Sequence, residues 1–144
     1  MTSKRTLTFC LLAMISGCGE PEPELVPVAG TVTVDGQPLS KGTVAFVPDA
    51  ARGNQSLDTP QGKIAPDGTY QLKTLDKLGA APGRYKVVVS ATANEPPPAD
   101  SYAVKDWRPE WLVNIKYTQA QTTDLSREVV ATPPPGAYDL RLTK

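Results

Sequence analysis

The stretch "VAGTVTVDGQPLSKGTVAFVP", residues 28–48, contains two runs in which apolar and polar residues alternate. A period of two is typical of a β-strand with one buried face, and β-branched residues favour that conformation. The apolar residues that share a face are Val28, Val32 and Val34 in the first run and Val44 and Phe46 in the second. Because Asp35-Gly36 is a strong turn signal, we expect residues 28–34 and 42–48 to form a β-hairpin.

Four further segments repeat this pattern and are predicted to be strands. Two follow the turn residues Pro66 and Pro82, and two lie at 125–131 and 137–143. The residues expected to point inward are Tyr70, Leu72, Tyr85, Val87, Val89, Tyr138, Leu140 and Leu142. No helix long enough for a crossover between parallel strands is visible. The sequence therefore predicts an all-β fold, a small antiparallel β-sandwich of about seven strands.

Two segments interrupt the predicted strands. Residues 49–63 have no apolar periodicity and carry turn-forming residues throughout, so we expect a long exposed loop that is either functional or mobile. Residues 96–98 are three prolines, which cannot donate hydrogen bonds to a sheet and predict a break.

Residues 106–112, "DWRPEWL", are predicted to form one helical turn capped by Asp106. Such a turn would present two tryptophans as a stacking platform for a sugar, with charged neighbours as polar partners. These candidate ligand-binding residues are Trp107, Trp111, Arg108 and Glu110. The alternative is that the tryptophans cover one open end of the sandwich.

The N-terminus has the organisation of an export signal. Lys4 and Arg5 precede an apolar run over residues 7–15, which is too short to span a bilayer. Residues 15–18, Ile-Ser-Gly-Cys, resemble the bacterial lipoprotein box. The resemblance implies cleavage before Cys18 and attachment of this cysteine to membrane lipid.

These features predict three regions: a signal peptide at 1–17, a lipidated Cys18 with a Pro/Glu tether at 18–26, and the β-sandwich at 27–144. Cleavage would remove Cys10, leaving Cys18 without a disulfide partner. Attachment through at least two acyl chains is stable, whereas one chain holds only marginally.

Composition argues against several functions. The chain has no histidine, so the usual catalytic base is absent. A metal site built on one cysteine would also need histidine or clustered carboxylates as further ligands. Loss of residues 1–17 would take away two of the 15 basic residues and none of the 15 acidic ones, for a net charge of −2. We therefore expect no nucleic-acid partner, no metal and no cofactor. Asp35 and Asp67 each precede glycine and are interpreted as turn residues.

Four phrases in order resemble small bacterial lipoproteins with a carboxypeptidase regulatory-like domain, a transthyretin- or prealbumin-like, Ig-like β-sandwich. The phrases are "GTVTVDGQPLSKGTVAFVP" at 30–48, "APDGTYQLKT" at 65–74, "GAAPGRYKVVV" at 79–89 and "KYTQAQTTDLSREV" at 116–129. Asn114, where the family pattern suggests proline, and the prolines at 133–135 depart from it. Transthyretin-like sandwiches include hydrolases of 5-hydroxyisourate, but these use histidines that this chain lacks.

We therefore expect a non-enzymatic module of the cell envelope, lipid-anchored at the outer membrane or periplasmic face. Its task would be structural, adhesive or protein-interacting, with an envelope protein or glycan as partner. The alternative is a carbohydrate- or peptide-binding module that uses Trp107, Trp111 and the 49–63 loop.

Overall fold

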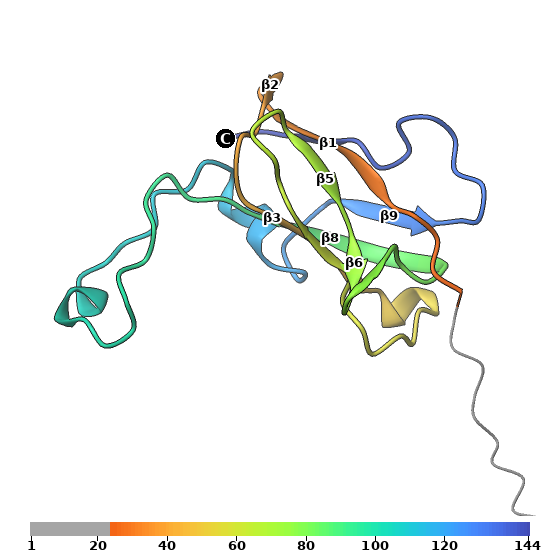
Figure 1. Cartoon of the computed structure of the whole chain (residues 1–144), viewed down its shortest axis with the longest axis horizontal. Helices are drawn as coiled ribbons and strands as arrows, with labels where there is room; N and C mark the ends of the chain where they lie inside the picture. The colour runs from red at the N-terminus through yellow and green to blue at the C-terminus, as the bar shows by residue number, and fades with distance from the viewer. Residues whose placement is uncertain (1–23) are drawn as a thin grey trace, which may run out of the picture.

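The structure, a computed structural model, describes residues 24–144. In this part of the chain, ten β-strands form two sheets, accompanied by three short 3₁₀ helices (Figure 1). The strands are β1 (Ala29–Val34), β2 (Gln37–Pro38), β3 (Thr43–Pro48), β4 (Gln61–Lys63), β5 (Thr69–Gln71), β6 (Lys73–Thr74), β7 (Lys77–Leu78), β8 (Gly83–Ser90), β9 (Ser126–Val129) and β10 (Leu140–Leu142). The helices are η1 (Ala50–Arg52), η2 (Tyr102–Lys105) and η3 (Ile115–Thr118). The all-β, sandwich-like fold is confirmed, with ten strands where about seven were expected.

The predicted hairpin between residues 28–34 and 42–48 is wrong. Asp35 and Gly36 do form a two-residue turn, and their φ angles of 49° and 84° match the type I′ geometry of tight hairpins. This turn connects β1 to the two-residue strand β2, however, and not to β3. One more hydrogen bond follows β2, from the Leu39 N–H to the carbonyl oxygen of Val32 at 2.9 Å, before the chain leaves β1. β3 lies in the other sheet, where it pairs antiparallel with β8.

Glycine at position 42 allows the chain to cross from β2 to β3. Its φ of 125° is one that other residues rarely adopt, and a Cβ there would lie 2.6 Å from the carbonyl oxygen of Ser90. The backbones of β3 and the end of β8 therefore approach more closely than any side chain would permit.

The first sheet contains β10, β1 and β2 side by side, with β5 also paired to β1. β1 and β10 run parallel, with Val32 opposite Leu140, so the sheet is mixed and the expectation of a purely antiparallel sandwich is corrected. The second sheet has the order β7-β6-β4-β3-β8-β9, and its pairings are antiparallel.

Residues 69–74 connect the two sheets. β5 pairs with β1 in the first sheet, and after Leu72 the chain continues as β6, which pairs with β4 in the second. The Leu72 N–H donates to the carbonyl oxygen of Val28 at 2.9 Å, and its side chain is fully buried. The two layers are thus tied together at this edge.

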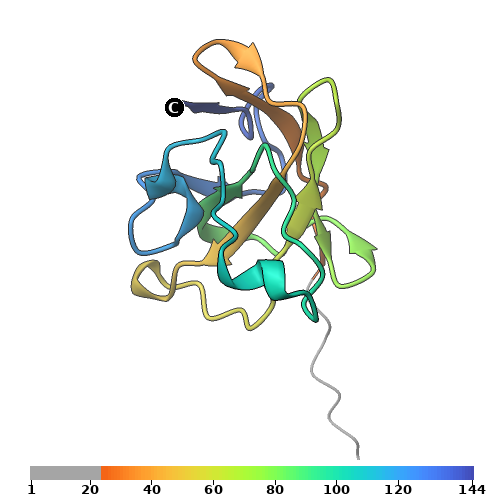
Figure 2. The same ribbon diagram turned by 90° about the vertical axis from the view of Figure 1, so that its left-hand side faces the viewer.

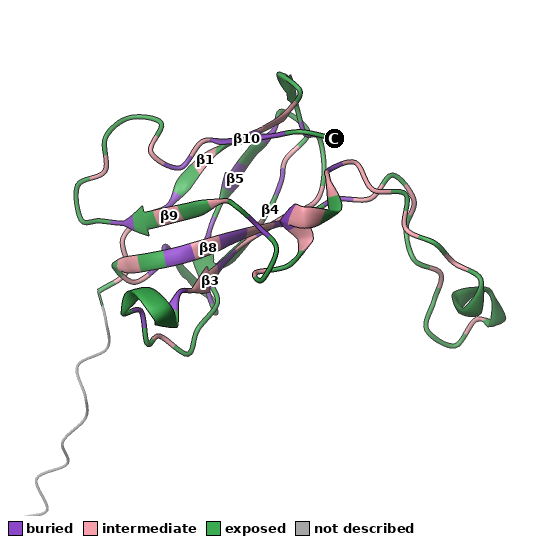
Figure 3. Ribbon diagram, turned by 180° about the vertical axis from the view of Figure 1, so that it is seen from behind, coloured by how far each residue is buried: buried purple, intermediate pink, exposed green. Residues whose placement is uncertain are grey.

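One apolar core lies between the sheets. Buried residues alternate with half-buried or exposed ones along β8, as Figure 3 shows. The predicted inward residues that are buried are Val28, Val32, Val44, Phe46, Tyr70, Leu72, Tyr85, Val87, Val89, Tyr138, Leu140 and Leu142. The exception is Val34, which is half-buried. The centroid of the Phe46 ring lies 5.8 Å from that of Tyr85, on the neighbouring strand β8, and 6.4 Å from that of Tyr138, in the turn before β10. Aromatic rings of the second sheet therefore meet one from the chain that leads into the first sheet.

The segment 49–63 is mostly exposed, as predicted, but it is not without regular structure. It contains η1 and β4, and its Asn54 side chain is buried. Asn54 donates through Nδ2 to the carbonyl oxygen of Arg84 at 2.9 Å and accepts the N–H of Ser56 at 3.1 Å. These hydrogen bonds fix the loop against the start of β8.

Candidate functional site

A projecting arm, residues 92–111, carries the four candidate ligand-binding residues. It leaves the sandwich after β8 and returns before η3, with η2 at its far end (Figures 1 and 2). Thr92 and Trp111 pair at its base, and the Ala93 N–H donates to the carbonyl oxygen of Glu110 at 2.8 Å. The arm is therefore a narrow two-stranded extension rather than a continuation of either sheet.

The Asn94 side chain closes the arm above this pairing. Its Nδ2 donates to the carbonyl oxygen of Arg108 at 2.8 Å, and its Oδ1 accepts the N–H of Glu110 at 2.8 Å. The side-chain amide thus replaces a pair of backbone hydrogen bonds between the two sides of the arm. The prolines that follow, at 96–98, have no N–H to donate such bonds. The predicted break at these prolines is confirmed.

The helical turn predicted at 106–112 is wrong. The helix of the arm is η2, whose N-terminus is capped by Ser101 Oγ accepting the Ala103 N–H at 3.2 Å. Asp106 follows η2 as its C-cap instead of beginning a helix. Pro109 disfavours helical geometry at the residue before it, and the strand-like pairing with 92–94 keeps 108–111 extended.

Because no helix joins them, the two tryptophans do not share a helical face. Trp107 lies just after η2 at the far end of the arm, whereas Trp111 lies at its base opposite Thr92. The Arg108 guanidinium is engaged within the arm, since Nη1 donates to the carbonyl oxygen of Trp107 at 3.0 Å. The structure therefore gives two separate half-buried tryptophans, and only Trp107 is placed where a partner would meet the arm first.

The indole of Trp107 has an unused hydrogen-bond donor. Its Nε1 is buried and has no acceptor among residues 24–144. Buried donors are normally paired, so this N–H is a potential contact for an added acceptor. Nearby, the Tyr102 side chain on η2 is 100% exposed.

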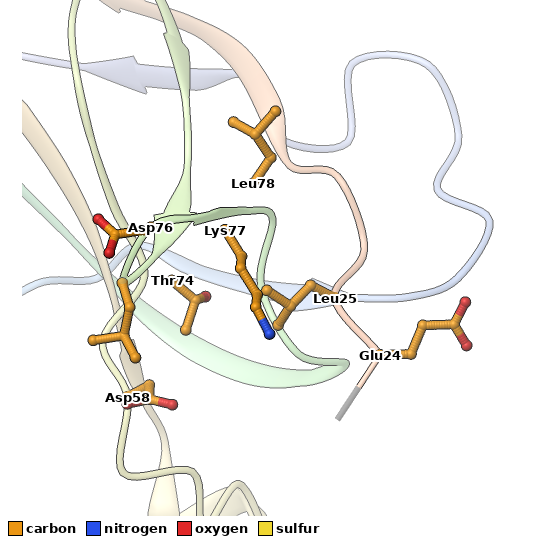
Figure 4. Close-up of a pocket in the computed structure, with 8 residues that line it drawn as sticks. Glu24, Leu25, Asp58, Thr74, Asp76, Lys77 and Leu78 are labelled. Atoms are coloured by element: carbon orange, nitrogen blue, oxygen red, sulfur yellow. The ribbon is translucent and has the colours of Figure 1, made fainter. Parts of the chain in front are cut away.

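A second candidate feature, which the sequence did not reveal, is a cavity of about 570 Å³ (Figure 4). We name it the hairpin cavity, because residues 74–78 of the β6–β7 hairpin line it together with Glu24, Leu25 and Asp58. The hairpin is held by Thr74 Oγ1, which donates to the carbonyl oxygen of Gly79 at 2.7 Å. The only sequence signal was a pair of leucines at a turn, Leu75 and Leu78, where polar residues are usual.

A smaller depression, of about 110 Å³, is lined by charged residues that already have partners. Arg84 Nη2 lies 3.4 Å from Glu128 Oε2, and Arg52 Nε lies 3.8 Å from Asp49 Oδ2. Both arginine side chains are about half exposed, so these pairs contribute little to stability.

The titration behaviour of the core points to structural roles. Burial raises the pKa of the Tyr70 phenol well above its usual value, and its hydroxyl donates to the Tyr138 carbonyl oxygen at 2.6 Å. Burial likewise raises the pKa of Tyr85. Asp67 accepts the N–H and hydroxyl of Thr69 at 3.0 and 2.7 Å, which lowers the pKa of its carboxyl and confirms it as a turn residue.

Within residues 24–144, no group of three or more His, Cys, Asp or Glu side chains is placed to hold a metal ion. The same part of the chain contains no helix that is long and apolar enough to cross a membrane. Cys18, the predicted lipid attachment point, lies outside the residues that the structure describes.

Comparisons with family models, with curated proteins and with solved structures find no match to this chain. The resemblance to lipoproteins with a carboxypeptidase regulatory-like domain thus stays a prediction from the quoted phrases, and function must be argued from the chain's own residues.

Proposed function

We propose that this chain is a non-enzymatic, lipid-anchored β-sandwich of the cell envelope, held through Cys18 and acting as a structural, adhesion or protein-interaction module. The observation that carries the proposal is the order of a basic start, an apolar run and the Ile-Ser-Gly-Cys box at 15–18, followed after a short Pro/Glu stretch by a folded domain. A further implication is exposure to the outer-membrane or periplasmic face rather than to the cytoplasm.

The chemistry of the described residues is compatible with a binding role. The chain has no histidine, and its buried tyrosines donate to backbone carbonyls of the core. The arm, by contrast, presents the fully exposed Tyr102 side chain, and it also carries the half-buried Trp107. A projecting element with aromatic side chains is a common way to contact a partner.

The anchor is tested by changing Cys18→Ser in the full chain. Lipidation at this sulfur should precede cleavage, so the variant should accumulate as unprocessed precursor that lacks the mass of a diacylglycerol. Mass spectrometry of the membrane fraction measures both effects.

Cys10→Ser is the matched control. It changes the other cysteine of the chain, which lies in the predicted signal peptide, and the variant should be processed and acylated normally. Normal processing of Cys18→Ser, or mature wild-type protein without acyl mass, would contradict the proposal.

A second candidate function, glycan or peptide binding by the arm, is favoured by the unpaired indole N–H of Trp107. Titration of the protein with glycans and peptides should shift tryptophan fluorescence, and Trp107→Ala should abolish the shift. Trp111→Phe is the control and should keep it, since Trp111 lies at the base of the arm. Loss of the shift in the control alone, or no shift with any ligand, would count against this candidate.

A further inference from the structure

Three leucines give the hairpin cavity an apolar rim: Leu25, Leu75 and Leu78, which we name the leucine patch. Leu75 is 82% exposed and Leu78 is 51% exposed, and Leu57, next to the cavity-lining Asp58, is 100% exposed. Exposed leucines are ordinary when scattered singly, but several around one cavity indicate an interaction surface.

Leu75 has, in addition, a backbone conformation that disfavours leucine. Its φ of 54° lies in the left-handed region, where glycine and asparagine are preferred. A residue that is both strained and exposed contributes little to the core, so the needs of the fold do not explain a leucine here. A role for the apolar side chain at the surface does explain it.

The position of the patch relative to the predicted anchor narrows the choice of partner. Leu25 and Glu24 line the cavity at the start of the described chain, six residues after Cys18. Because an extended chain spans at most about 3.6 Å per residue, six residues reach no further than about 22 Å. If Cys18 is acylated, the patch therefore cannot lie far from the lipid headgroups.

We infer that the leucine patch docks the domain onto the bilayer that holds its anchor, an inference that rests on the proposed function. Leu75 and Leu78 insert at the boundary between headgroups and acyl chains, as the apolar face of a peripheral protein does. Three carboxylates, Glu24, Asp58 and Asp76, line the same cavity with Lys77. This excess of negative charge favours a zwitterionic over an anionic lipid surface.

Depth-dependent fluorescence quenching tests this orientation in the full, processed chain. Leu75→Cys is labelled with an environment-sensitive dye and reconstituted in vesicles of phosphatidylethanolamine and phosphatidylcholine. The matched control is Tyr102→Cys, at a fully exposed position on the far end of the arm. Circular dichroism verifies that both variants are folded.

We expect lipids with a quencher on the acyl chain to quench the dye at position 75 several-fold more than the dye at 102. Equal, weak quenching at both positions would overturn the inference while leaving the anchor intact. The inference would also be overturned if the dye at position 75 were shielded from water but not quenched by the lipids. That result would indicate that a protein covers the patch. Mature protein without either substitution tests the anchor separately. If Cys18 is not acylated, its free thiol reacts with the dye, and the proposed function itself fails.

Discussion

The Tyr70 hydroxyl shows how a single polar atom fixes the core of this protein. It donates to the carbonyl oxygen of Tyr138, and the neighbouring carbonyl oxygen, of Asp139, accepts from Arg127 Nη2 at 2.7 Å. The backbone that leads into β10 is thereby held from both sheets, since Tyr70 lies in β5 and Arg127 in β9. Satisfied buried carbonyls are what allow a loop to enter an apolar core.

Leu75 is the residue whose replacement should stabilise the protein. Leu75→Gly removes the left-handed strain of an L-residue, while the exposed side chain contributes little packing. We expect the free energy of unfolding to rise by about 1 kcal/mol. Denaturant titration of the full chain measures the change.

Leu78→Gly is the control, because position 78 has no positive φ and lies in β7, where glycine should destabilise. A loss of stability in Leu75→Gly would mean that the leucine side chain packs in the folded protein and would weaken the case for a functional surface.

Among the elements, the arm is the one least connected to the core. η2 contains no buried residue, and hydrogen bonds of the Asn94 side chain join the two sides of the arm. An exposed hydrogen bond from Lys41 Nζ to the Ala93 carbonyl oxygen, at 2.7 Å, ties only the base of the arm to the rest of the domain. Long surface insertions of this kind carry only a small loop-closure cost. The arm is therefore separable from the fold in energetic terms.

Replacing residues 95–107 with two glycines should leave the sandwich folded. Because the deleted segment buries little against the sheets, we expect the free energy of unfolding to stay within about 1 kcal/mol of the original. Thermal unfolding followed by circular dichroism measures this.

Asn54→Ala is the contrasting variant: it removes two hydrogen bonds from a buried side chain and should cost about 1–3 kcal/mol. If the shortened arm were the more damaging of the two changes, the arm would have to be regarded as part of the core.

At the scale of the whole molecule, local patterns predicted strands and inward faces but not their partners. The alternation of apolar and polar residues identified Val87 and Val89 as core residues, because a strand with one buried face has an apolar residue at every second position. The pairing of β1 with β10 joins residues far apart in the sequence, and no local pattern encodes it. The hairpin error has the same origin, since Asp35-Gly36 predicts a turn but not the length of the strand that follows.

The candidate site was less predictable than the fold. The prolines at 96–98 predicted a break in the strands, but not the arm that follows. The helix was placed at 106–112 and in fact begins earlier, after the N-cap Ser101. Asn114 caps η3 by accepting the Lys116 N–H at 3.1 Å, a cap that was not predicted from the sequence. The leucine patch needs two distant segments, the one with Leu25 and the 74–78 hairpin, to be brought together, so it becomes visible only in the folded chain.

The parallel pairing of β1 with β10 also bears on when the chain folds. Val32 in the first strand meets Leu140 in the last, so the first sheet stays incomplete until the C-terminal residues have been synthesised. Contacts between distant parts of a chain form slowly, because the intervening segment must first be brought into a loop. A chain synthesised only as far as β9 thus lacks one strand of the first sheet. If the chain is exported as proposed above, this late pairing favours a chain that is still incompletely folded when translocation begins.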